Sequence, residues 1–317
     1  MTLRAAAIDC GTNSVRLLIA EEGPAGLLEV DRALHLTRLG QGVDATGRFA
    51  PEALARTLDA VADFAARLRR HGAERVRFVA TSAARDASNR EEFFAGVREL
   101  LGVEAEIISG DEEARLSFAG ALSVARDVAW PVLVMDIGGG STELVLGESD
   151  AAGAPVVRAA RSLDVGSVRL RERFLHSDPP APEQVAAASA HVDDLIAHSG
   201  VDVAAARTWI GVGGTATSLA AIALGLPVYD RARVDGATIA RADLQALAAL
   251  LLALPVAEVL QFPTMQPKRA DVICAGALIA ARAGVVCPVD LRVSEADILD
   301  GIVLDLLAPA GGTRAAL

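Results

Sequence analysis

One pattern of apolar and polar positions occurs at two places in the chain, residues 7–19 and 132–146. In each, an apolar run ends in an aspartate, a short turn of glycine and small polar residues follows, and a second apolar run begins at once. Apolar runs joined by so short a connection predict two β-hairpins. When the aspartates are aligned, the matched pairs are Asp9 and Asp136, Gly11 and Gly138, Ser14 and Ser141, and Leu17 and Leu144, with Arg16 opposite Glu143.

The recurrence predicts a duplicated α/β protein with two domains, residues 1–126 and 127–317, the last helix being free to pack back on the first domain. Each half would offer one hairpin to a shared cleft, where ligand sites concentrate. The expected strands are 3–9, 14–21, 27–37, 75–80, 103–108, 132–137, 142–148, 154–162 and 289–293. The expected helices, from apolar residues at helical spacing, are 51–71, 90–101, 109–125, 183–198, 240–253, 271–284 and 295–307.

The second hairpin carries the strongest chemical signal. Its three glycines, residues 138–140, allow backbone conformations that side chains forbid, and they leave amide N–H groups uncovered. Such a turn can wrap an anion. Asp136 and Glu143 would stand at its rim, where their oxygens suit a cation such as Mg²⁺. A phosphate and metal site is the functional interpretation, and the alternative is a tight glycine hairpin whose acids lie at the edge in water.

Three further segments carry candidate chemistry. Residues 81–89 follow an expected strand with hydroxyls, an arginine and an asparagine, and they either hold a ligand or cap the next helix. Asp111 and Glu112 complement the dipole of the helix that they open. Glu113 lies one residue deeper and could deprotonate a water beside a phosphate. Residues 209–219 predict a strand, a glycine turn and a helix whose N-terminus can hold phosphate.

Composition narrows the possible partners and location. The formal net charge of −11 disfavours nucleic acid, and no apolar run reaches the roughly 20 residues of a membrane span. Three widely spaced cysteines, with no evident secretory signal, favour a reducing cytoplasm. Lys268, the only lysine, and Arg269 form the best cationic pair of the second half and are possible contacts for an anionic ligand.

Five motifs together make the chain resemble the exopolyphosphatase/guanosine pentaphosphate phosphatase (Ppx/GppA) family. In chain order they are IDCGTNS (8–14), TSAARD (81–86), IISGDEEAR (107–115), DIGGGSTE (136–143) and GVGGT (211–215). The ordered set is far more specific than any one motif. The resemblance implies an α/β fold of two ribonuclease-H-like domains of the actin/Hsp70/sugar-kinase superfamily around an interdomain cleft. It matches the short form of the family, without a further C-terminal helical domain.

The resemblance also implies roles for particular residues. Glu113 matches the catalytic base that activates water, and Glu143 matches the second catalytic carboxylate. The metal, Mg²⁺ or Mn²⁺, would be held by Asp136 and Glu143, with Asp9 as a further contact. The phosphate-binding residues would be Asn13, Ser14, Arg85, Gly138, Gly139, Gly140, Ser141 and Thr142, and the nucleotide or second phosphate loop Gly211, Gly213, Gly214 and Thr215. Lys268 and Arg269 would be possible contacts for polyphosphate.

The activity that the resemblance implies is Mg²⁺-dependent hydrolysis of the terminal phosphate of inorganic polyphosphate. pppGpp is the alternative substrate; polyphosphate is favoured because the short form has no obvious extra element for a guanine base. A small-molecule kinase and a nucleotide-sensing actin-like protein are less favoured hypotheses, and the family implies a homodimer. Two departures are Cys10, where many members have a small or aliphatic residue, and the scarcity of lysine, which argues against a long basic channel.

Overall fold

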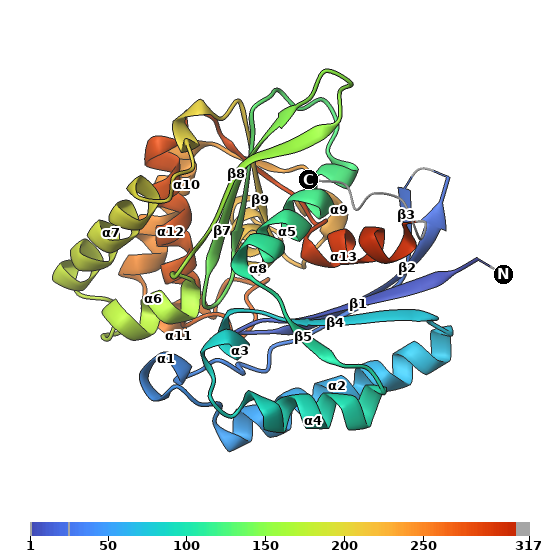
Figure 1. Cartoon of the computed structure of the whole chain (residues 1–317). Helices are drawn as coiled ribbons and strands as arrows, with labels where there is room; N and C mark the ends of the chain where they lie inside the picture. Colours follow the sequence, from blue (N-terminus) through green and yellow to red (C-terminus); the bar gives the residue numbers. More distant parts are fainter. Residues whose placement is uncertain (1, 25, 309–317) are drawn as a thin grey trace. The chain divides into compact units, whose positions relative to one another are not determined.

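The computed structural model describes residues 2–24 and 26–308, which divide into two compact units (Figure 1). Unit 1 comprises Met1–Val124 and Ala296–Leu317, and unit 2 comprises Ala125–Glu295. The first boundary lies close to the expected one. The last helix, although it follows unit 2 in the chain, belongs to unit 1. None of the helices in the described part of the chain has the length and apolar character of a transmembrane segment.

Unit 1 is built on a five-stranded sheet with the order β3-β2-β1-β4-β5. β1, β2 and β3 form an antiparallel meander, β4 runs parallel to β1, and β5 runs parallel to β4. The strands are β1 (Arg4–Cys10), β2 (Val15–Gly23), β3 (Gly26–His35), β4 (Arg75–Ala80) and β5 (Ala105–Ile107). The apolar run of β1 is buried on both faces, as expected for a strand at the centre of a covered sheet.

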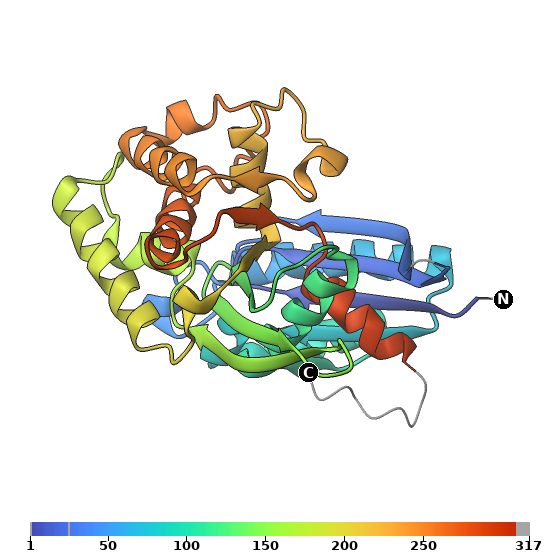
Figure 2. The same ribbon diagram turned by 90° about the horizontal axis from the view of Figure 1, so that it is seen from above.

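Helices cover both faces of the unit 1 sheet (Figures 1 and 2). α2 (Pro51–His71) and α4 (Arg90–Leu101) pack on one face, and α13 (Ile298–Leu307), with α5 (Gly110–Val124) beside it, packs on the other. Successive residues of β1 divide between the two cores because side chains alternate along a strand. Two short helices, α1 (Val43–Thr46) and α3 (Ser82–Asp86), follow β3 and β4.

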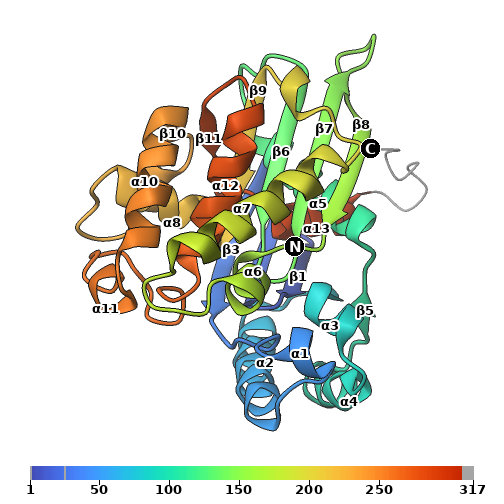
Figure 3. The ribbon, with the colours of Figure 1, turned by 90° about the vertical axis from the view of Figure 1, so that its left-hand side faces the viewer.

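Unit 2 has six strands in the order β10-β11-β9-β6-β7-β8. They are β6 (Val132–Ile137), β7 (Thr142–Ser149), β8 (Pro155–Leu163), β9 (Thr208–Val212), β10 (Thr238–Ile239) and β11 (Leu291–Val293). The helices are α6 (Ser167–Phe174), α7 (Pro182–Ala197), the 3₁₀ turn η1 (Val203–Ala205), α8 (Gly213–Ala223), α9 (Arg231–Val234), α10 (Arg241–Ala253), α11 (Val256–Val259) and α12 (Ile273–Val286). The longer helices of this unit, α7, α10 and α12 among them (Figure 3), share one core with the sheet. Trp209 is the largest fully buried side chain of that core.

The two sheets share one arrangement, which confirms the predicted duplicated fold. β6, β7, β8 and β9 repeat the order and the directions of β1, β2, β3 and β4. The register shift between the second and third strands falls at Ile19/Ala20 in unit 1 and at Leu146/Gly147 in unit 2, which are equivalent positions when the aspartates are aligned. An antiparallel meander continued by parallel strands is the expected ribonuclease-H-like arrangement, and each unit has it.

The elements that differ from expectation are short. Residues 81–89 contain the one-turn helix α3 rather than an open loop. Asn89 precedes α4, but its side chain makes no cap to that helix. Its Oδ1 instead accepts the Phe49 N–H at 2.8 Å, so the alternative of a helix cap is wrong for this residue.

Candidate active site

The first hairpin joins β1 to β2 through a tight turn. The Gly11 N–H donates to the Ser14 carbonyl at 2.9 Å, and the register sets Asp9 opposite Arg16. Arg16 donates to Asp9 Oδ2 from Nε at 3.1 Å and from Nη2 at 2.6 Å. Asp9, expected as a metal contact, is therefore part of an ion pair within its own hairpin.

The turn of the first hairpin has polar atoms with unused hydrogen-bonding capacity. Thr12 Oγ1 and Asn13 Oδ1 are buried and have no hydrogen-bond partner among the described residues. Such atoms are rare in native proteins and indicate a ligand or ordered water. The Gly40 N–H holds the turn through the Thr12 carbonyl at 2.8 Å. Asn13 and Ser14, expected to bind phosphate, thus lie together in a turn that the Gly40 N–H holds from a neighbouring loop.

The second hairpin has the same turn and a different charge pair. The Gly138 N–H donates to the Ser141 carbonyl at 3.0 Å, but here the register sets Asp136 opposite Glu143. Both carboxylates are buried, with exposed fractions of 9% and 2%. Ser162, which lies opposite Glu143 on β8, donates from Oγ to Glu143 Oε1 at 2.7 Å. Two acids that oppose each other on adjacent strands repel unless a cation or donors stabilise them.

The carbonyl groups of the glycine turn are held by helix α6. The N–H of Ser167 donates to the Gly138 carbonyl at 2.9 Å, and the N–H of Val168 donates to the Gly139 carbonyl at 2.8 Å. A Cβ at Gly166 would lie 2.5 Å from the backbone of Gly139, so only glycine permits this close approach. The helix N-terminus, whose first N–H groups need acceptors, therefore fixes the conformation of the turn.

Thr142 and Ser141 lie beside this turn in different roles. The Thr142 hydroxyl donates to the Val165 carbonyl at 2.6 Å, which ties β7 to the segment before α6. Its hydroxyl is thus engaged in the fold, although it was expected to bind phosphate. Ser141 is buried at the end of the turn, next to the three glycines.

The loop after β9 packs directly on the second hairpin. Gly213 has a φ of +76°, and a Cβ there would lie 2.5 Å from Asp136 Oδ1. The Thr215 hydroxyl donates to the Ile137 carbonyl at 2.9 Å. Two motifs that are far apart in the sequence thus form one surface in unit 2. Gly211, expected in this loop, lies within β9, where a Cβ would meet the Leu291 side chain at 2.8 Å.

Lys268 and Arg269, the expected cationic pair, have different surroundings. Arg269 contacts the loop after β9, and Lys268 lies at the surface. Arg269 donates from Nη1 to the Gly214 carbonyl and to Ser218 Oγ, both at 2.6 Å. Its guanidinium therefore covers the first turn of α8, and a Cβ at Gly214 would lie 2.4 Å from Nη2. Lys268 is exposed.

The acids in the first turn of α5 differ in burial: Glu112 is half-buried and Glu113 is buried. Arg77 Nη2 donates to Glu112 Oε1 at 2.6 Å, in an ion pair near the surface. Glu113 is only 8% exposed, and its Oε2 accepts Arg85 Nη1 at 2.9 Å. The same nitrogen donates to the Ile108 carbonyl at 3.0 Å. Arg85, expected to bind phosphate, and Glu113, expected to be the base, are thus a contacting pair in unit 1.

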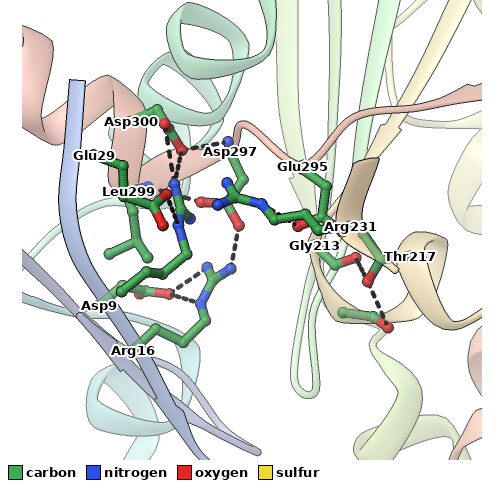
Figure 4. Close-up of polar contacts among 12 residues, drawn as sticks. Asp9, Arg16, Glu29, Gly213, Thr217, Arg231, Glu295, Asp297, Leu299 and Asp300 are labelled. Atoms are coloured by element: carbon green, nitrogen blue, oxygen red, sulfur yellow. Dashed lines mark hydrogen bonds and ion pairs between the residues drawn. The ribbon is translucent and has the colours of Figure 1, made fainter. Parts of the chain in front are cut away.

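Two residues that contact the hairpins, Ser162 and Asp297, were not predicted from the sequence. Ser162 contacts Glu143 because of the register of β8. Asp297 precedes α13, accepts the Leu299 N–H at 3.0 Å and forms an ion pair with Arg16 (Figure 4). An aspartate before an apolar helix is a capping signal, but nothing in the sequence connects it to the first hairpin.

The electrostatics of the two hairpins differ. Burial raises the pKa of the Asp9 carboxyl above its ordinary value, and the opposing effect of Arg16 offsets only part of this shift. In the second hairpin, Asp136 and Glu143 present oxygen ligands on one face of the sheet, which fits a hard divalent cation. No group of three or more acidic, histidine or cysteine side chains that could hold a metal occurs in the described residues. A Mg²⁺ ion here would take its other ligands from water and phosphate, as it commonly does.

Comparison with known proteins shows to which family the chain belongs. The model of the Ppx/GppA phosphatase family matches residues 18–308. The chain belongs to this family. Its similarity to the family therefore extends through both units, from the first hairpin's second strand to the end of α13.

Individual relatives agree with this assignment. The chain is 47% identical to a protein named exopolyphosphatase 2 from Mycobacterium tuberculosis, over 96% of this chain and 98% of that protein. A crystal structure of an exopolyphosphatase-like protein is 45% identical, with a TM-score of 0.91 over 96% of this chain and 99% of the other. A Ppx/GppA family member from Aquifex aeolicus is 30% identical, with a TM-score of 0.81 over 97% and 98%. The expected family and its hydrolase class are confirmed.

Proposed function

We propose that the protein is an exopolyphosphatase, which hydrolyses the terminal phosphate of inorganic polyphosphate with Mg²⁺. The observation that carries the proposal is the second hairpin, where Asp136 and Glu143 oppose each other beside a three-glycine turn whose carbonyl groups accept hydrogen bonds from α6. Membership of a phosphatase family supports the reaction class, and the similarity to the M. tuberculosis exopolyphosphatase 2 supports the substrate.

In the proposed mechanism Glu113 accepts a proton from the attacking water. Its burial and its contact with Arg85 hold the carboxylate in one orientation, and a positioned base is what in-line attack on a phosphoryl group requires. The second nitrogen of the Arg85 guanidinium can reach a phosphate oxygen, since arginine binds two oxygens with one planar group. Arg85 would then couple the position of the base to that of the substrate.

The second hairpin and the loop after β9 would bind the phosphate chain. Backbone N–H groups of residues 139–141 and the N-terminus of α8 are suitable donors for phosphate oxygens. Asp136 and Glu143 would hold the Mg²⁺ ion, with Ser162 orienting Glu143. When bound, the ion neutralises charge that develops on the phosphoryl oxygens. In unit 1, Asn13 and Ser14 would offer the corresponding turn.

The first experiment measures phosphate release from short-chain polyphosphate, long-chain polyphosphate, pppGpp and ATP in parallel, with Mg²⁺ present. We expect release from polyphosphate. Release mainly from pppGpp would make the protein an alarmone phosphatase instead. No release from any of the four would favour the two other hypotheses. A kinase would form ADP only with an acceptor present, and a nucleotide-sensing actin-like protein would assemble when nucleotide is added.

The second experiment tests Glu113 against its neighbour. Glu113→Gln keeps an oxygen for Arg85 and should lose about 10²–10⁴ in turnover, the usual contribution of a general base. Glu112→Gln is the matched control, because it removes one charge from the same helical turn in a pair near the surface. Near-normal phosphate release by Glu113→Gln would remove this residue from the mechanism, and an equal loss in both variants would indicate a general effect of charge.

Oligomeric state and location belong to the same proposal. A homodimer and a cytoplasmic location are expected for a family member with this composition. Sedimentation of the purified chain tests the first, and fractionation of cells tests the second.

A further inference from the structure

The two hairpins have one backbone and opposite charge patterns. At equivalent register positions, Asp9 opposes Arg16 in unit 1 and Asp136 opposes Glu143 in unit 2. The third strand differs in the same way, because Leu34 lies opposite Arg16 whereas Ser162 lies opposite Glu143. The first hairpin thus brings its own cation to the aspartate, and the second brings a further carboxylate and a hydroxyl donor.

Arg16 is engaged on both sides of its guanidinium (Figure 4). Nε and Nη2 donate to Asp9 Oδ2, and Nη1 donates to Asp297 Oδ2. The three side chains are largely buried, with exposed fractions of 15%, 8% and 6% for Arg16, Asp9 and Asp297. A planar guanidinium between two carboxylates can satisfy both through directed hydrogen bonds. A hydrated divalent cation at the same place would have to displace it.

The Arg16 contact also extends to α13. Asp297 caps this helix through the Leu299 N–H at 3.0 Å, and Asp300 Oδ2 accepts the Asp297 N–H at 3.1 Å. Arg32 of β3 donates from Nη2 to both oxygens of Asp300 at 3.1 and 3.2 Å. Two arginines of the antiparallel meander therefore hold two acids at the start of α13, and Arg16 links this group to the first hairpin.

We propose that Arg16 supplies at the first hairpin the positive charge that a divalent cation supplies at the second, so that Asp9 is not a metal ligand and the chain binds one catalytic cation. Arg16 is then a positioning residue: it fixes Asp9 and the first turn of α13 without a metal. The inference rests on the proposed metal site at Asp136 and Glu143. It differs from the expectation that Asp9 shares in metal binding.

The test counts Mn²⁺ ions per chain by electron paramagnetic resonance during equilibrium titration. Wild type should bind one ion, which Glu143→Gln loses and Asp9→Asn retains. Arg16→Glu gives the first hairpin the same acid pair as the second, and it should bind a second ion. Arg16→Lys is the control, because it keeps the charge and should leave the number at one.

Stability provides a readout that does not depend on counting. Arg16→Gln leaves Asp9 and Asp297 without the shared guanidinium, so its Tm should fall and should rise again with Mn²⁺ by more than the wild-type Tm does. This variant replaces Arg16→Glu if the latter does not fold. The inference is overturned if Asp9→Asn loses an ion, if Arg16→Glu folds and binds no more ions than wild type, or if Mn²⁺ raises the Tm of Arg16→Gln no more than that of wild type.

The outcomes separate this inference from the proposed function. If wild type binds no Mn²⁺ while Arg16→Glu binds one ion, the metal site at the second hairpin fails and the role of Arg16 stands. If wild type binds one ion that Glu143→Gln loses, and Arg16→Glu gains none, the proposed function stands and the role of Arg16 fails.

Discussion

The contact between Gly213 and Asp136 can be tested by the smallest substitution, Gly213→Ala. The added methyl group would lie 2.5 Å from Asp136 Oδ1, whereas real Cβ contacts essentially never fall under 3.0 Å. The carboxylate must therefore move away from the loop. Gly236→Ala is the matched control in the same unit, because Gly236 also has a φ of +76° and a Cβ there would have nothing within 4 Å.

The two effects of the substitution have separate magnitudes. A left-handed conformation costs an alanine about 1–2 kcal/mol, and in a domain the size of unit 2 each kcal/mol lowers Tm by about 2–4 °C. Both variants should therefore lose roughly 2–8 °C, measured by circular dichroism. Only Gly213→Ala also displaces a proposed metal ligand, and displacements of about 1 Å near a reacting group can cost roughly 10²-fold in rate.

The assay is Mg²⁺ titration of phosphate release from polyphosphate, for wild type and both variants. We expect Gly236→Ala to keep the wild-type turnover and Mg²⁺ requirement below its melting range. Gly213→Ala should lose turnover, need more Mg²⁺, or both. Equal turnover and equal Mg²⁺ requirement in the two variants would refute the assignment of Asp136 to the metal site.

Three further predictions follow from particular contacts. Ser162→Ala removes the donor to Glu143 and should raise the required Mg²⁺ concentration by about 10–100-fold, the usual cost of losing a partner of a metal ligand; Ser162→Thr should restore it, and an unchanged requirement in Ser162→Ala would contradict the role. Gly301→Ala places a Cβ 2.0 Å from the Leu116 carbonyl oxygen, so its Tm should fall further than that of Gly102→Ala, where φ is +70° and nothing lies within 4 Å; the reverse order would contradict the close packing of α13 on α5. Chelation by EDTA should abolish phosphate release and added Mg²⁺ should restore it, whereas activity that survives EDTA would exclude a required metal.

The sequence predicts the hairpins well because their determinants are local. Strand periodicity, the glycines and the short connections fix the turns, and the spacing of Asp136 and Glu143 then fixes which residues oppose each other. The phase of α5 is also local, so that Glu113 could be expected to lie deeper than Glu112, and it does. α3 was not predicted, because a single helical turn has no apolar periodicity to detect.

The parts that the sequence does not predict depend on pairing between distant segments. Ser162 lies opposite Glu143 only because β8 has a particular register, which shifts at Leu146/Gly147 further along the strand pair. Arg16 and Asp297 are neighbours in unit 1, although almost the whole chain separates them. The capping signal of Asp297 identifies a helix start, but a cap is not specific for any one arginine.

The two hairpins share one backbone arrangement and differ in charge. The bond that closes each turn, the register across each pair and the shift in the third strand are all retained, and these depend on glycine and strand pairing rather than on charge. Between residues 9–19 and 136–146, charge differs at one position, where Arg16 corresponds to Glu143. At that position Glu143 faces a second carboxylate, and their repulsion must be offset by a cation or by hydrogen-bond donors, whereas Arg16 is paired with Asp9 within the protein. The fold is therefore insensitive to this difference in charge, on which the proposed metal site depends.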